Sequence, residues 1–169
     1  MRYPLLAYVH LLAAATWLGG TLFLAMVLVP VTRSAQGSPA AGVAVLRSAA
    51  RRFRTVAWAA AVVLIVSGAW LYLQRGGSMA GFFTGEGDFA QVLRLKVALV
   101  AAVIVLSAAH DFVLGPRLAR EMEALQRGSP PPARIARQRR AVTWLARVNL
   151  LLVLAIVGFG VALVRGVSS

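Results

Sequence analysis

The 169-residue sequence contains no cysteine and very few acidic residues. Without cysteine, the chain has no disulfide, thiolate metal site, iron–sulfur cluster or cysteine nucleophile. Charged residues make up 14% of the chain, against about a quarter in an ordinary soluble domain, while 60% are apolar and the mean hydropathy is +0.78. Its 18 Lys and Arg against 5 Asp and Glu give a formal net charge of +13. This composition excludes an ordinary water-soluble domain.

The excess of basic residues does not indicate a nucleic-acid partner, because these residues lie between long uncharged apolar runs. That distribution is typical of membrane proteins. The sequence also lacks glycine-rich phosphate loops, paired carboxylates and an HExxH zinc motif, so no hydrolase or transferase site is predicted. We expect one small integral membrane domain over residues 1–169.

Four segments are long and apolar enough to cross a bilayer, which takes roughly 20 residues of helix. The predicted spans are residues 4–31, 56–73, 92–114 and 141–164. The fold class is therefore all-α, an integral membrane four-helix bundle of two antiparallel hairpins. Pro30 and Pro116 are expected to end the first and third spans, because proline cannot continue a regular helix without cost. Gly19 and Gly20 are expected to form a close-packing notch, and residues 81–87 an external loop with a short interfacial helix.

Arginines are concentrated in two connecting segments, the first between spans one and two and the second between spans three and four. Together these segments carry twelve arginines and two glutamates: Arg33, Arg47, Arg51, Arg52, Arg54, Arg117, Arg120, Arg127, Arg134, Arg137, Arg139, Arg140, Glu121 and Glu123. By the positive-inside rule, both segments face the cytoplasm and both termini lie on the periplasmic or extracellular side. We expect a multi-pass protein of the cytoplasmic membrane, surrounded by lipid, whose glycine and alanine residues are compatible with a homodimer.

A few polar side chains lie inside the apolar spans, where each costs on the order of 2.5–3.5 kcal/mol and usually marks a function or a specific pair. His10 is predicted near the external end of span one and His110 near the cytoplasmic end of span three, with a depth difference of roughly 15–20 Å. Two axial haem ligands lie only about 4 Å apart, so His10 and His110 of one subunit should not hold the same haem. Either there are two sites, or a single site uses one histidine together with another ligand or a second subunit. The alternative for each histidine is a hydrogen-bonded packing role.

Four charged residues also lie within the predicted spans, and two of them, Arg94 and Lys96, are at the start of the third. Asp111 and Arg147 are expected to form a structural pair, because either buried charge alone would cost several kcal/mol. Lys96 either extends its ammonium to the membrane interface or contacts a metal or a haem propionate.

Two segments resemble the copper resistance protein D (CopD) family. Residues 8–30, YVHLLAAATWLGGTLFLAMVLVP, contain a histidine, then Trp-Leu-Gly-Gly, then an apolar run ending in proline. Residues 93–118, LRLKVALVAAVIVLSAAHDFVLGPRL, contain a lysine and end near a histidine and a Gly-Pro turn. The resemblance implies a four-helix membrane module associated with copper passage or copper resistance.

The layout is also similar to that of HemJ-type protoporphyrinogen oxidases, which bind b-type haem and have a histidine in span one and a lysine in span three. That resemblance points to His10 and Lys96. After Trp17 the sequence lacks the family's aromatic-rich stretch with an arginine and a terminal histidine, which argues against protoporphyrinogen oxidation.

We therefore expect a membrane protein with one or two b-type haems, which transfers electrons or carries out a redox reaction with an unidentified redox partner or quinone. The predicted metal ligands are His10 and His110, and the other predicted cofactor contacts are Lys96, Met26, Trp17 and Tyr72. The first alternative is copper transport or copper resistance using His10, since imidazole suits copper. The second is a structural membrane partner without a cofactor, with a polar clasp formed by His110, Asp111, Arg147 and Asn149.

Overall fold

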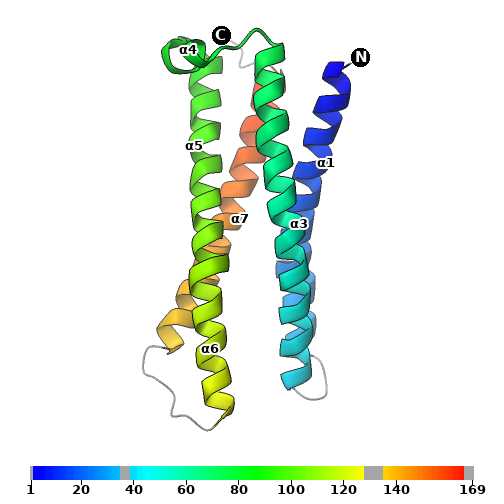
Figure 1. Ribbon diagram of the computed structural model, residues 1–169, viewed down its shortest axis with the longest axis vertical. Helices are drawn as coiled ribbons and strands as arrows, with labels where there is room; N and C mark the ends of the chain where they lie inside the picture. Colours follow the sequence, from blue (N-terminus) through cyan, green and yellow to red (C-terminus); the bar gives the residue numbers. More distant parts are fainter. Residues whose placement is uncertain (1, 35–38, 128–134, 166–169) are drawn as a thin grey trace. The chain divides into compact units, whose positions relative to one another are not determined.

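The computed structural model describes residues 2–34, 39–127 and 135–165, and its regular elements are helices (Figure 1). In chain order they are α1 (Arg2–Phe23), the π-helix η1 (Leu24–Leu28), α2 (Val29–Ser34), α3 (Pro39–Gln74), α4 (Met79–Thr84), α5 (Asp88–Ala108), the π-helix η2 (Ala109–Leu114), α6 (Gly115–Gln126) and α7 (Ile135–Arg165). The predicted all-α fold class is confirmed.

Four continuous helical stretches are long and apolar enough to cross a membrane: Tyr3–Thr32, Ala41–Gln74, Asp88–Glu121 and Ile135–Leu163. Each contains most of one predicted span. The helices are longer than those spans, because Arg47 and Arg54 lie on α3 and Arg117 lies on α6 instead of in loops. Hydropathy marks where the bilayer ends, whereas a helix satisfies its own backbone hydrogen bonds and can continue into water. Arg134 lies outside the described residues.

The first of two compact units, Met1–Gly85, is a hairpin in which α1 packs along α3 (Figure 1). Near one end Arg75 Nε donates to the Tyr3 hydroxyl at 2.9 Å, and further along the Phe53 ring covers Gly20. Residue numbers rise along α1 as they fall along α3, so the helices are antiparallel. The buried residues of this unit with small side chains are Ala13, Ala60, Ala61 and Ser67. The predicted notch is confirmed at Gly20, whereas Gly19 faces open space.

The second unit, Glu86–Ser169, is a hairpin of α5 and α7. The Ser107 hydroxyl of α5 donates to Asn149 Oδ1 of α7 at 3.4 Å. Nearer the other end of α5, the Lys96 side chain lies against Gly160, where an added Cβ would be 3.4 Å from Nζ. This order is again antiparallel. Its buried apolar residues are Val103, which is 0% exposed, and Val153, which is 4% exposed.

Pro30 and Pro116 do not end their helices, which corrects the prediction. Each follows a π-helical turn, and α-helix resumes beyond it in α2 and α6. The N–H of Val29 bonds the Leu24 carbonyl, and the N–H of Gly115 bonds the His110 carbonyl, each five residues back. A proline ring clashes with the carbonyl four residues earlier in a regular helix. We attribute the continuation to the wider π-turn, which moves that carbonyl aside.

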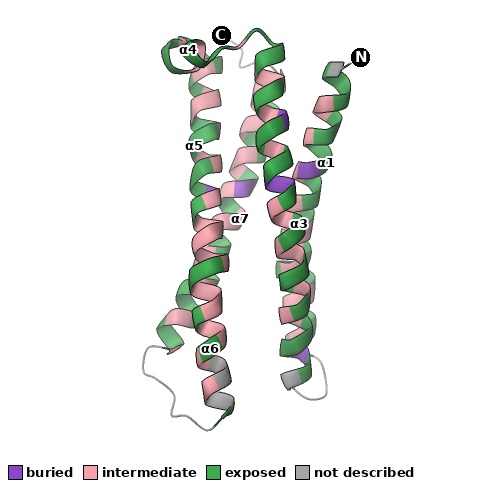
Figure 2. Ribbon diagram, in the orientation of Figure 1, coloured by how far each residue is buried: buried purple, intermediate pink, exposed green. Residues whose placement is uncertain are grey.

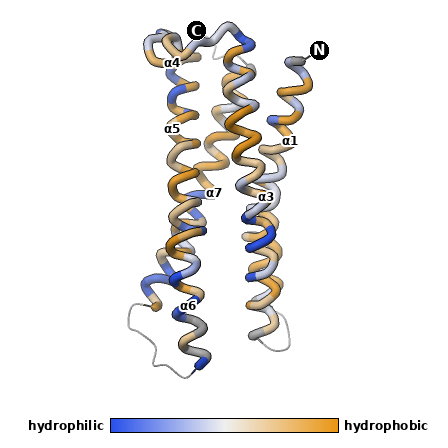
Figure 3. Tube along the Cα trace, viewed as in Figure 1, coloured by the Kyte–Doolittle hydropathy of each residue, from blue (hydrophilic) through white to orange (hydrophobic). Residues whose placement is uncertain are grey.

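Large apolar side chains cover the outside of both units. Leu11, Val105 and Leu151 are each about two-thirds exposed, and buried positions are few along all four long helices (Figure 2). Hydrophobic residues continue along most of each long helix (Figure 3). Apolar surface of this extent requires a hydrocarbon environment. The protein is therefore a multi-pass membrane protein.

The short helix predicted in the external loop is present as α4. Its first turn is capped by Ser78, whose side chain accepts a hydrogen bond from the Gly81 N–H at 3.0 Å. The Tyr72 hydroxyl donates to the Ser78 carbonyl at 3.1 Å, and the Tyr72 ring meets that of Phe82 edge-on. These contacts fix α4 to the end of α3.

Candidate metal-binding histidines

His10 lies on α1 and is half-buried against α3. Its Nδ1 is 2.8 Å from Oγ of Ser67, a residue that is 3% exposed. The Ser67 hydroxyl donates to the Val63 carbonyl one turn back on α3, so its oxygen accepts the proton of His10 Nδ1. Because a neutral imidazole carries one N–H, the lone pair of His10 is on Nε2. A histidine whose other nitrogen is held in this way is typical of metal ligands.

Gly68, the residue after Ser67, gives the imidazole its room. A Cβ at this position would lie 3.2 Å from His10 Cε1 and 3.7 Å from Nδ1. Glycine therefore lets the ring approach the α3 backbone closely. Our interpretation of the sequence missed both residues. The available signal was that Ser67 is the only serine or threonine in the predicted span 56–73.

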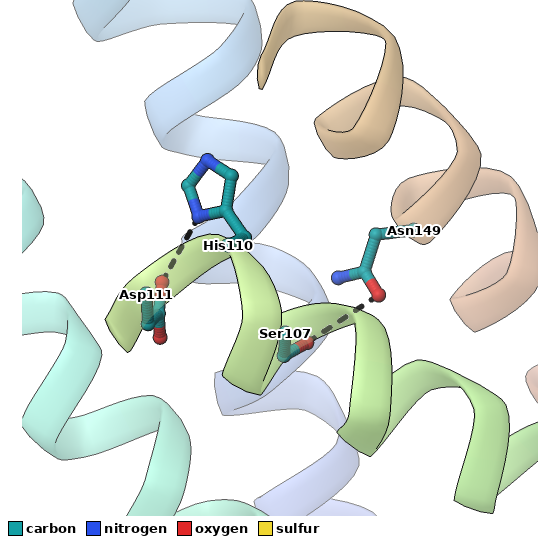
Figure 4. A network of polar contacts seen from close by, with 4 residues as sticks. All are labelled: Ser107, His110, Asp111 and Asn149. Carbon is teal, nitrogen blue, oxygen red and sulfur yellow. Dashed lines mark hydrogen bonds and ion pairs between the residues drawn. The ribbon is translucent and has the colours of Figure 1, made fainter. Parts of the chain in front are cut away.

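His110 lies in the π-helix η2, and its Nδ1 is 3.0 Å from Oδ1 of Asp111 (Figure 4). The two side chains are 36% and 23% exposed. When Nδ1 donates to the Asp111 carboxylate, a neutral imidazole has its lone pair on Nε2. A carboxylate behind an imidazole is common at metal sites, and π-turns are frequent at functional sites. The partner of His110 is its chain neighbour, whereas the partner of His10 comes from a second helix.

The other predicted cofactor contacts have different surroundings. Trp17 is half-buried on α1, and its carbonyl accepts the Thr21 hydroxyl at 2.8 Å. Met26 is on η1 and 70% exposed. Tyr72 supports α4, and Lys96 lies against α7, as described above. A role for these four side chains in holding a cofactor stays a prediction.

The predicted ion pair of Asp111 and Arg147 also stays a prediction. Asp111 accepts from His110, and the Arg147 guanidinium carbon is 5.5 Å from the centroid of the Trp144 ring. Of the four residues in the predicted polar clasp, Asn149 does connect two helices, through Ser107 (Figure 4).

No group of three or more His, Cys, Asp or Glu side chains that could hold a metal occurs within residues 2–34, 39–127 and 135–165. His10 belongs to the first unit and His110 to the second. Each imidazole provides one coordination bond. A single imidazole nitrogen is typical of a site that holds its ion with few protein ligands, whereas a closed structural site has four.

Comparison with known proteins identifies one family. Copper resistance protein D (CopD) matches residues 47–163, more than half of the chain. The matched range includes Ser67, Lys96 and His110 and begins after His10. A search of curated proteins finds no match, and a search of solved structures finds none either. The chain belongs to the copper resistance protein D family.

Proposed function

We propose that this membrane protein binds copper as its cargo at His10 and takes part in copper passage or copper resistance. Membership of the CopD family supports the association with copper. The observation that carries the assignment to His10 is the 2.8 Å hydrogen bond from its Nδ1 to Ser67, because this bond leaves the lone pair on Nε2. Imidazole nitrogen is a suitable copper ligand.

A cargo site must release its ion as well as bind it. The chain has no cysteine thiolate, and the described residues form no cluster of three strong ligands. A copper ion on His10 would therefore keep positions open for donors from a delivering or receiving molecule. A site with a small number of protein ligands is more suitable for passage of an ion than for its permanent storage.

The proposed orientation follows the arginines. The segments rich in arginine face the cytoplasm, and both termini lie outside. His10 is eight residues from Arg2, so it would lie roughly 12 Å from the external end of α1. In this arrangement His10 serves the outer side of the membrane.

Haem b, at one or two sites per chain, is the second candidate. It is favoured by the His110–Asp111 contact, because a carboxylate partner makes an axial imidazole more basic. Bound haem would supply one-electron chemistry, and the protein would set its ligation and polarity. Electron transfer or an oxidoreductase activity with a quinone or another redox partner would then follow.

The test uses the full chain purified in detergent, with Cu(I) titrated against a Cu(I) chelator and the bound metal examined by X-ray absorption. We expect nitrogen coordination in the wild type and at least tenfold weaker Cu(I) binding in His10→Ala. His110→Ala is the matched control and should retain the wild-type affinity. In copper-containing medium, cells expressing His10→Ala should differ in survival from cells expressing wild type.

Unchanged Cu(I) affinity in His10→Ala, with an intact fold by circular dichroism, would refute the copper assignment. A Soret band in protein isolated from native membranes, reduced in His10→Ala or His110→Ala, would establish haem instead. The two readouts are independent, so each candidate function can fail by itself.

A further inference from the structure

The first turns of α7 carry an exposed cluster that the copper function does not use. A hollow of about 480 Å³ is lined by Arg140, Thr143, Trp144 and Arg147. The spacing of three, four and seven residues places these side chains on one face of the helix. Trp144 is 63% exposed, and the Arg147 guanidinium lies over its ring, 5.5 Å from the centroid. The hollow is thus lined by two guanidinium groups, a hydroxyl and an indole ring.

On α7 itself the charge has one sign, and the nearby carboxylate of Glu121 on α6 accepts a hydrogen bond from Gln138. No Asp or Glu occurs anywhere in residues 135–165, so α7 itself has no carboxylate to neutralise the arginines. A guanidinium presents a fork of N–H donors that matches the oxygens of a phosphate. The chemistry of the cluster therefore fits a phosphate group attached to an apolar molecule.

The position of the cluster along α7 indicates where that molecule comes from. Residues 148–164 contain no charged side chain and follow Arg147 directly. At a rise of 1.5 Å per residue this run is about 25 Å long, close to the roughly 30 Å hydrocarbon core of a bilayer. Arg147 would lie at the edge of the hydrocarbon and Arg140 two turns further out. Figure 3 shows the same change, from hydrophilic at the start of α7 to hydrophobic beyond it.

We propose that this hollow binds the headgroup of an anionic phospholipid at the bilayer surface. Tryptophan is enriched at the headgroup level, and basic pockets at that level bind anionic lipids. Val148 and Leu151, one and two turns beyond Trp144 on the same face, are 41% and 65% exposed and provide an apolar surface for an acyl chain. A second copy of this chain would be a poor occupant, because each copy has only 5 acidic residues against 18 basic ones.

The test uses the full chain, delipidated in detergent, titrated with phosphatidylglycerol or phosphatidylcholine and followed by native mass spectrometry. Wild type should bind phosphatidylglycerol in preference to phosphatidylcholine. Arg140→Gln and Arg147→Gln should each weaken phosphatidylglycerol binding about fivefold, the change expected for one basic residue near an anionic lipid surface. Arg137→Gln removes an exposed arginine of the same helix that does not line the hollow, and should bind like wild type.

Three results would overturn the proposal. Equal binding of the two lipids would exclude recognition of the anionic headgroup, and equal losses in Arg137→Gln and Arg147→Gln would indicate a diffuse effect of net charge. Complete displacement of phosphatidylglycerol by millimolar inorganic phosphate would identify a site for a free anion instead. Arg147→Lys is the control for misfolding. It keeps the positive charge and should therefore bind phosphatidylglycerol more tightly than Arg147→Gln.

Discussion

Replacing Ser67 by alanine tests whether the second helix of the hairpin prepares His10 for coordination. The substitution removes one oxygen from a site that is 3% exposed and leaves the imidazole itself in place. His10 Nδ1–H then loses its hydrogen bond to Ser67, and this bond no longer favours the tautomer with the lone pair on Nε2. We expect weaker copper binding without loss of the coordinating residue.

The expected magnitude follows from the contact. An interhelical hydrogen bond in a membrane protein contributes about 0.6 kcal/mol on average and at most about 1.7 kcal/mol. Because Ser67 is nearly inaccessible, we expect Ser67→Ala to lower the free energy of unfolding by about 1 kcal/mol. Loss of a residue that orients a metal-binding histidine usually weakens metal binding about 10–100-fold.

The assay combines Cu(I) competition with unfolding in mixed detergent and dodecyl sulfate. The matched control is Ser107→Ala, which removes a serine from the other hairpin, where its hydrogen bond to Asn149 is longer at 3.4 Å. Ser107→Ala should leave the copper affinity unchanged. If Ser67→Ala binds Cu(I) as tightly as wild type, or if both serine variants weaken it equally, the proposed orienting role of Ser67 is wrong.

Two further predictions concern packing. Gly20→Ala should destabilise the protein by about 1–3 kcal/mol, because the new Cβ overlaps the Phe53 ring. The control Gly19→Ala faces open space and should be neutral or stabilising by up to about 1 kcal/mol. Indistinguishable unfolding curves of the two variants would contradict this prediction. Val103→Ala removes fully buried methyl groups and should cost about 1–3 kcal/mol in the same assay, and Val105→Ala, at a 66% exposed position, should cost less than about 0.5 kcal/mol. A larger loss in Val105→Ala would show that this surface packs against protein.

The sequence predicted the number and approximate positions of the apolar helices, because a bilayer imposes a minimum length of uncharged helix. It did not predict how far the helices continue. Arg47 and Arg54 were expected in a loop, since charge indicates the end of the hydrocarbon, but charge in water does not interrupt a helix. Pro30 was expected to end a helix because the local rule considers a regular α-helix, whereas a preceding π-turn changes the geometry.

The sequence predicted the histidines of the candidate site but only part of their surroundings. His10 and His110 stand out as rare polar residues in apolar spans. The side chains that hydrogen-bond these histidines, Ser67 and Asp111, are harder to identify from the sequence. Asp111 is adjacent to His110 in sequence and was predicted to pair with Arg147 and to belong to the same polar clasp as His110. Ser67 is 57 positions from His10, and only the packing of α1 on α3 brings the two together.

The π-turns have a consequence for any scan of positions along α1 or α5. Each turn inserts one residue relative to a regular helix, so the residues that follow are rotated by about 100° from the face that a constant period would assign. A lipid-exposure pattern measured by labelling should therefore show a phase jump near residues 24–28 and again near 109–114. Deleting a single residue inside either turn should restore one continuous α-helical period across it. Because both turns lie two residues before a proline, the same deletion should bring the proline ring against the carbonyl four residues earlier.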